Sequence, residues 1–104
     1  MARYAGLNHQ GSMIESIKHK GLKLFFEHGD ASKLPQEMLS RIRLILAALD
    51  AAPTIEFMSQ PTLRLHPLKG KLKGYWAVTV RANWRITFAF DNGRAKDVDF
   101  VDYH

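Results

Sequence analysis

The 104-residue chain contains no cysteine, which excludes disulfides, thiolate nucleophiles and cysteine ligands for zinc. It also has no apolar run near the roughly 20 residues that a membrane-spanning helix needs, so no membrane partner is expected. A chain of this length is expected to form one domain with a limited core, too small to enclose a large cofactor, and no cofactor is predicted. The lack of cysteine fits a cytoplasmic protein, and we expect that location.

Acidic residues are scarce as well. The chain has 15 Lys and Arg against 10 Asp and Glu, a formal net charge of +5. The excess is concentrated between residues 60 and 94, where Asp91 is the one acid beside seven basic residues: Arg64, Lys69, Lys71, Lys73, Arg81, Arg85 and Arg94. A local basic cluster favours a polyanionic partner, most often nucleic acid. A solubilising charged surface explains the composition about equally well.

The first residues of the chain lack the apolar stretch of a signal peptide. They end in Gly11 and Ser12, directly before a second methionine, Met13. We therefore expect residues 1–12 to be a leader left from expression, outside the fold, and residues 13–104 to form a single domain. The alternative is a native flexible arm.

Two segments have the periodicity of amphipathic helices. The first, His19–His28, is followed by Gly29, a natural stop, and carries apolar residues at helical spacing: Leu22, Phe25 and Phe26. The second begins near Pro35 and is closed by Pro53. Its apolar residues step by three or four and form one stripe: Met38, Ile42, Ile45 and Leu49.

Beyond Pro53 the apolar period changes to two residues, which predicts half-buried strands. Four strands are expected, around Leu63/Leu65, Trp76/Val78/Val80, Trp84/Ile86/Phe88/Phe90 and Val98/Phe100. The turn-prone links Arg81–Asn83 and Asp91–Gly93 predict that the last three form an antiparallel meander. Met13–Ile17 is expected to be a further, first strand. The predicted fold class is α/β in the α+β sense: a mostly antiparallel sheet with two helices packed on one face.

The alternation also assigns the two faces of this sheet. Trp76, Ile86 and Val98 are expected to face the helices, because only their set is apolar enough, and Trp84 shares their packing role. The opposite face is expected to carry the residues of opposite parity, provided that no bulge intervenes: Arg64, His66, Arg85 and Tyr103.

These residues are of the types that cleave RNA without a metal. Histidine exchanges protons near neutral pH, and arginine binds phosphate in a bidentate manner. Cleavage needs a group that takes the proton of the 2′-hydroxyl, a cation for the phosphorane and an acid for the departing 5′-oxygen. Asp102, Tyr103 and His104 end the chain, where a strand end is expected to place them beside His66.

Each candidate also has a structural explanation. His66 precedes Pro67 and could cap a loop. Arg85 could be a surface ion-pair partner, as most exposed arginines are. Tyr103 could be an amphipathic residue at a strand edge. His104 is terminal, and terminal residues usually fray. For each candidate taken singly, the functional explanation is no stronger than the structural one, but together the candidates favour RNA chemistry.

Two further patterns are weaker. Asp102 with His66 and His104 lacks a recognised metal-ligand spacing, so no metal site is predicted. The run Lys69–Lys73 is typical of a solvated loop, although it adjoins His66. The alternative function is a non-catalytic basic module that binds nucleic acid or the ribosome. Such a module would keep the basic strip without needing His66 or Tyr103.

Several motifs together resemble the HigB (host inhibition of growth) toxins of the RelE superfamily. They are His19-Lys-Gly-Leu-Lys-Leu-Phe25, His66-Pro-Leu-Lys-Gly70, Gly74-Tyr-Trp76, Val80-Arg-Ala-Asn-Trp-Arg-Ile-Thr-Phe88 and Asp102-Tyr-His104. The resemblance runs over residues 13–104, and the combination is specific where no single piece is.

The resemblance implies a microbial-RNase-like fold and an endoribonuclease toxin of a type II toxin–antitoxin pair. Such a toxin enters the A site of the small ribosomal subunit, cuts mRNA there without a metal and stops translation. It is inhibited by a HigA-type helix-turn-helix antitoxin, which represses the shared operon, so the toxin meets operon DNA only through the antitoxin.

The resemblance also assigns residues. The catalytic set is His66, Arg85, Tyr103 and His104, and the RNA- or phosphate-binding set is Lys69, Lys71, Lys73, Arg64 and Asp102. We interpret His66 as the general base, with Tyr103 or His104 as the acid or as a positioning group. Arg85 and Lys69 would stabilise the phosphate.

Overall fold

The computed structural model describes residues 13–103 of the chain. Its first helix, α2 (Lys20–His28), forms where the sequence predicts it. The His19 side chain caps it by accepting a hydrogen bond from the Leu22 amide at 3.2 Å. Gly29 ends it with a φ of 72°, a left-handed conformation that glycine adopts without a Cβ penalty. The predicted leader, residues 1–12, lies outside the described residues, and the division of the chain into leader and domain stays a prediction.

The second helix begins later than Pro35 suggests. Pro35 is followed by one turn of 3-10 helix, η1 (Gln36–Met38), and the α-helix proper, α3, spans Leu39–Ala51. The predicted stripe is otherwise confirmed, since one side of α3 is buried: Ile42, Ile45, Leu46 and Leu49. No helix within residues 13–103 is both long and apolar enough to cross a membrane.

Three of the predicted strands form the expected meander. They are β2 (Tyr75–Arg81), β3 (Trp84–Asp91) and β4 (Arg94–Asp102), in a four-stranded antiparallel sheet of order β1-β2-β3-β4. Two-residue links join them, and positive φ values at Ala82 (51°), Asn92 (51°) and Gly93 (74°) give these links the twist of tight hairpins.

The predicted strand around Leu63 and Leu65 is wrong for most of its length. Pro61–Leu63 is a 3-10 turn, η3, and Arg64 has a φ of 53°, so extended backbone cannot run through it. Of the predicted strand, only a two-residue segment, β1 (His66–Pro67), is extended and pairs with β2. Alternating leucines mark the burial of Leu63 and Leu65 here, not a continuous strand.

The predicted first strand is reduced to a looser contact. Ile14 and Ile17 form isolated parallel bridges with Ala95 and Val98 of β4, without a regular ladder between them. The segment therefore borders the free edge of β4 and adds a short parallel element to an otherwise antiparallel sheet.

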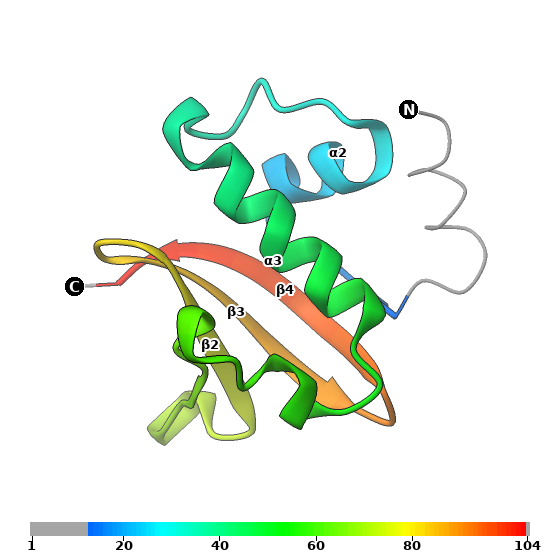
Figure 1. Cartoon of the computed structure of the whole chain (residues 1–104), viewed down its shortest axis with the longest axis vertical. Coiled ribbons are helices and arrows are strands. Elements are labelled where there is room, and N and C mark those ends of the chain that lie inside the picture. The colour runs from blue at the N-terminus through cyan, green and yellow to red at the C-terminus, as the bar shows by residue number, and fades with distance from the viewer. Residues whose placement is uncertain (1–12, 104) are drawn as a thin grey trace.

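Figure 1 shows α2 and α3 on the same side of the sheet, which confirms the predicted layers. The side chains between the layers are inaccessible to solvent and come from both helices and all three long strands, among them Phe26, Ile45, Val78, Ile86, Phe88 and Val98. Trp84 stacks on Phe100 at 4.6 Å between ring centroids, so it packs as predicted. Burial of each large apolar side chain in this set stabilises the fold by about 1.5–3 kcal/mol.

The strand pairing shifts register at two places, between Thr79 and Arg81 in the β2–β3 pair and between Thr87 and Ala89 in the β3–β4 pair, and the second shift changes the alternation along β4. Ala95 and Val98 are both fully buried although they stand three residues apart, and the pairing of β3 with β4 shifts register between them. Asp97 takes up the extra residue with a φ of 52°. Beyond it the alternation resumes, so the parity of residues 98–103 is as predicted.

Candidate functional site

The face of the sheet opposite the helices, which we call the open face, carries three of the predicted site residues: His66, Arg85 and Tyr103. Strand register lines up His66, Ala77, Thr87 and Asp99 across the four strands. A second row contains Thr79, Arg85 and Val101. Because side chains alternate along a strand, His66 and Arg85 project from the same face. The predicted parity of these two residues is confirmed.

His66 is held in one orientation and one tautomer. Its Nδ1 lies 3.0 Å from the carbonyl oxygen of Arg64. A carbonyl oxygen can only accept, so Nδ1 must carry the proton. In the neutral ring, Nε2 then has its lone pair free, which is the arrangement that a general base requires.

The segment before His66 is fastened by a residue that the sequence did not point to. Arg41 of α3 donates from Nε and Nη2 to the carbonyl oxygen of Thr79, at 3.2 and 2.9 Å, and from Nη2 to the carbonyl oxygen of Thr62. Arg41 thereby ties η3 to β2 immediately before the residues that place His66. Its position on α3 gives no sequence signal for this contact.

Arg85 is turned toward the β2–β3 turn. Its Nη1 donates to the carbonyl oxygens of Ala82, at 2.6 Å, and Trp84, at 3.2 Å. Its Nε is buried and has no hydrogen-bond partner within residues 13–103. A buried guanidinium donor without an acceptor is costly, and an anionic ligand would satisfy it.

Tyr103 continues the line of β4 onto the open face. Its amide donates to the carbonyl oxygen of Asn83 at 2.7 Å, and its side chain is 39% exposed. Asp102 is paired with Trp84 and shares its parity, so its side chain starts from the helix side of the sheet. Register therefore separates Asp102 from Tyr103. His104 lies outside the described residues.

The strand order does not put Asp102 and Tyr103 beside His66, contrary to the expectation, while the placement of His104 lies outside the described residues. His66 is on β1 and Tyr103 follows β4, with β2 and β3 between them. Three strand spacings separate β1 from β4 by about 14 Å, and Tyr103 also lies four residues beyond Asp99, the β4 residue in register with His66, which adds about 13 Å along the strand. A substrate that meets both side chains must therefore lie over β2 and β3, where Arg85 stands.

The basic loop follows β1 directly. Lys69 precedes a 3-10 turn, η4 (Gly70–Leu72), and Lys73 follows it. Lys69, Lys71, Lys73 and Arg64 are all exposed, and within residues 13–103 none of them forms an ion pair. Their charges are therefore available to a polyanion that approaches the β1 edge of the open face.

A shallow hollow of about 190 Å³ lies on the open face beside Tyr103. It is lined by Lys18, Leu72, Tyr75, Thr87, Asp97, Asp99, Val101 and Tyr103. Tyr75 donates to Asp97 Oδ2 at 2.8 Å. This hydrogen bond, together with the negative charge of Asp97, raises the pKa of Tyr75 above its usual value, so the phenol stays protonated.

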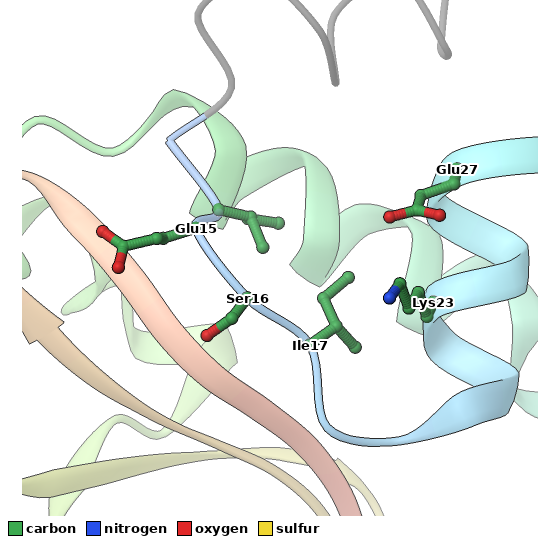
Figure 2. Close-up of a pocket in the computed structure, with 6 residues that line it drawn as sticks. Glu15, Ser16, Ile17, Lys23 and Glu27 are labelled. Carbon is green, nitrogen blue, oxygen red and sulfur yellow. The ribbon is translucent and has the colours of Figure 1, made fainter.

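A second hollow, of about 170 Å³, separates residues 14–17 from α2. Figure 2 shows Ile17 pointing toward Lys23 and Glu27 of α2, while Glu15 points away. No residue of the predicted site lines it. Within residues 13–103 no three His, Asp or Glu side chains are close enough to hold a metal ion together.

The fold is similar to that of two solved structures. The YoeB–YefM complex from Staphylococcus aureus matches with a TM-score of 0.57 and 17% identity over 88% of this chain and 97% of that chain. The YoeB dimer from the same organism matches with a TM-score of 0.56 and 16% identity, over 89% and 99% respectively. At these identities the likeness concerns the fold alone.

Sequence comparison is more specific. Residues 15–104 match the family model described as the RelE-like toxin of the type II toxin–antitoxin system HigB. A curated relative, the endoribonuclease HigB of Proteus vulgaris, is 52% identical over 92 residues, 88% of this chain and 100% of the relative. The chain is thus a RelE-like toxin of a type II system. Within that class it belongs to the HigB family, as the resemblance predicted.

Proposed function

We propose that the open face is the active site with which this toxin cleaves mRNA in the ribosomal A site, without a metal. As a member of the HigB family, the protein is an endoribonuclease toxin of a type II toxin–antitoxin system. The observation that supports the site best is the shared face of His66, with Nε2 free, and Arg85, with an unsatisfied donor. A proton acceptor and a cation are two of the three groups that phosphodiester cleavage requires, the third being an acid for the leaving oxygen.

The proposed reaction uses the 2′-hydroxyl of the RNA as the nucleophile. His66 Nε2 takes its proton, and the 2′-oxygen attacks the adjacent phosphorus. Arg85 and Lys69 stabilise the charge that develops on the phosphoryl oxygens. The bond from phosphorus to the 5′-oxygen breaks, and that oxygen receives a proton from Tyr103 or His104. The products are a 2′,3′-cyclic phosphate and a 5′-hydroxyl.

The placement of His66 and Tyr103 at opposite edges of the sheet is compatible with separate roles as base and acid. A base and an acid must approach opposite sides of the scissile phosphate, because one serves the attacking oxygen and the other the leaving oxygen. Side chains that rise from the two outer strands meet a phosphate placed over β2 and β3 from opposite sides. Arg85, on β3, lies beneath that position.

The proposed partners are an antitoxin, the ribosome and mRNA. Membership of a type II toxin–antitoxin family implies an antitoxin partner. We propose that it is a HigA-type helix-turn-helix protein, through which alone the toxin meets operon DNA, and that the toxin acts in the cytoplasm, where ribosomes are. A co-expressed antitoxin should bind tightly. A chain that is harmless and stable in cells without any partner would contradict the toxin assignment.

The proposed function is tested by mapping mRNA 5′ ends after induction, with and without translation. We expect new 5′ ends within translated codons that vanish when translation is blocked. The Arg85→Ala variant is the matched control and should produce few of them. Growth inhibition without new 5′ ends would instead favour a non-catalytic module that occupies the ribosome.

A further inference from the structure

The hollow beside Tyr103 has a composition that the cleavage chemistry does not explain. Two carboxylates, Asp97 and Asp99, lie in it, on a face whose substrate is a polyanion. They would repel a phosphate. The lining has one cation, Lys18, so its formal charge remains negative, and the other residues are Thr87 and four apolar or aromatic side chains, Leu72, Tyr75, Val101 and Tyr103. The hollow is therefore unsuited to the RNA backbone but suited to a base, which is flat, uncharged and rich in hydrogen-bond donors.

The two carboxylates differ in the hydrogen bonds that they accept. Asp97 accepts the hydroxyl proton of Tyr75 and fixes that ring at the rim. Asp99 uses one oxygen, Oδ1, to accept the amide of Phe100 at 2.9 Å. Its other oxygen has no partner within residues 13–103. Asp99 is thus held in position by the Phe100 amide and can accept a further hydrogen bond with its other oxygen.

Thr87 supplies a second unmet group beside Asp99. The two residues are directly opposite each other in the β3–β4 register, which places their Cβ atoms about 4.5–5.5 Å apart on one face. Thr87 is only 8% exposed and lines the hollow, yet its hydroxyl has no hydrogen-bond partner among the described residues. The hydroxyl oxygen is not among the fully buried unpaired atoms of the described residues, so it is accessible from the hollow and can donate to a ligand there.

We infer that this hollow is a base-binding subsite in which Thr87 and Asp99 read the amino-bearing edge of one unstacked mRNA base, favouring adenine, cytosine or guanine over uracil. The assignment rests on the proposed function. The carboxylate accepts from the exocyclic amino group, and the hydroxyl donates to the ring nitrogen or carbonyl beside it. Uracil has no amino group and would turn a carbonyl oxygen toward the carboxylate. The volume of about 190 Å³ is below that of pockets for drug-sized ligands and fits a single base.

The test is a cleavage profile on purified ribosomes programmed with mRNAs whose A-site codon and flanking positions are randomised. For the wild-type toxin we expect one position at which uracil is cut about tenfold less than the amino-bearing bases. Asp99→Asn replaces an acceptor with a donor, so the bias against uracil at that position should disappear. Thr87→Val should weaken it and Thr87→Ser should keep it. Asp91→Asn, the same change at an exposed site outside the hollow, should leave the profile unchanged.

Several outcomes would overturn the assignment. One is a wild-type profile without bias against uracil at any position, and another is an Asp99→Asn profile equal to that of the wild type. A third is an altered affinity for the antitoxin with an unaltered profile, since it would make the hollow a protein-docking site. If Asp99→Asn does not fold or cleave, the Thr87→Val and Thr87→Ser pair decides. Failure of the wild-type toxin to cleave at all would defeat the proposed function itself.

Discussion

The two faces of the sheet are made by the same strands but have opposite contents. On the helix side, Val78, Ile86 and Phe88 are completely buried. The open face carries His66, Arg85 and the hollow beside Tyr103, which contain polar atoms without a partner among the described residues. The comparison shows that adjacent residues of one strand serve different purposes, because one side chain packs in the core and the next lies on the proposed active face. Arg85 and Ile86 are neighbours on β3, yet only Ile86 belongs to the core.

The largest effect is expected at His66. Loss of a general base should lower the cleavage rate roughly 10²–10⁴-fold, so His66→Ala should be nearly inactive on programmed ribosomes while melting close to the wild type. His66→Asn is the informative control, because its amide can still donate to the Arg64 carbonyl oxygen but has no basic ring nitrogen. Full activity of His66→Asn would show that His66 only caps the loop.

On the other face, Ile86→Ala should lower stability by about 2–5 kcal/mol, since Ile86 is completely buried. Chemical denaturation measures this loss. Cleavage per folded molecule, assayed at low temperature, should remain near the wild-type rate because the open face is untouched. A large loss of cleavage by folded Ile86→Ala would erase the separation between the two faces.

Deletion of the last two residues should separate stability from cleavage, because terminal residues usually contribute little to folding. Among the described residues, Tyr103 contributes one backbone hydrogen bond and a side chain that is 39% exposed, so removing Tyr103 and His104 should lower the melting temperature modestly. The cleavage rate should fall roughly a hundredfold. Near-normal cleavage by a chain ending at Asp102 would leave the chemistry to His66, Lys69 and Arg85. Tyr103→Phe separates the hydroxyl from the ring.

The smallest effect is expected from the basic loop. Replacing Lys69, Lys71 and Lys73 with glutamine should reduce the slope of log affinity for ribosomes against log salt by about 2. The same replacement at three exposed lysines near the helices, Lys20, Lys23 and Lys33, is the matched control and should change it little. Equal slopes for both triple variants would show that the loop is only a solvated surface.

The parts of the fold that the sequence predicts are those with local signals. Spacing of three and four residues predicts α2 and α3, and turn-prone pairs between alternating strands predict both hairpins. The strand at Leu63 fails because the left-handed Arg64 and the contacts of Arg41 fix this segment through tertiary structure. The bulge at Asp97 has no local signal either, since aspartate is common in regular turns and bulges alike.

The site was predictable in part. Parity along β3 places Arg85 on the open face, and the same alternation places Thr87 and Asp99 there, although neither residue type by itself indicates RNA chemistry. The misplacement of Tyr103 beside His66 was avoidable, because a meander puts its first and last strands at opposite edges. The turn of Arg85 toward the Ala82 carbonyl oxygen, in contrast, depends on side-chain packing that no pattern encodes.

The most direct test of the central claim, that the open face performs cleavage, is the single-turnover rate of Arg85→Ala on mRNA-programmed ribosomes, measured beside its melting temperature. The loss of one preorganised cation should cost about 3–4 kcal/mol of transition-state stabilisation, a rate roughly 10²–10³-fold below the wild type, with a nearly unchanged melting temperature. A folded Arg85→Ala toxin that cleaves at the wild-type rate would contradict the account.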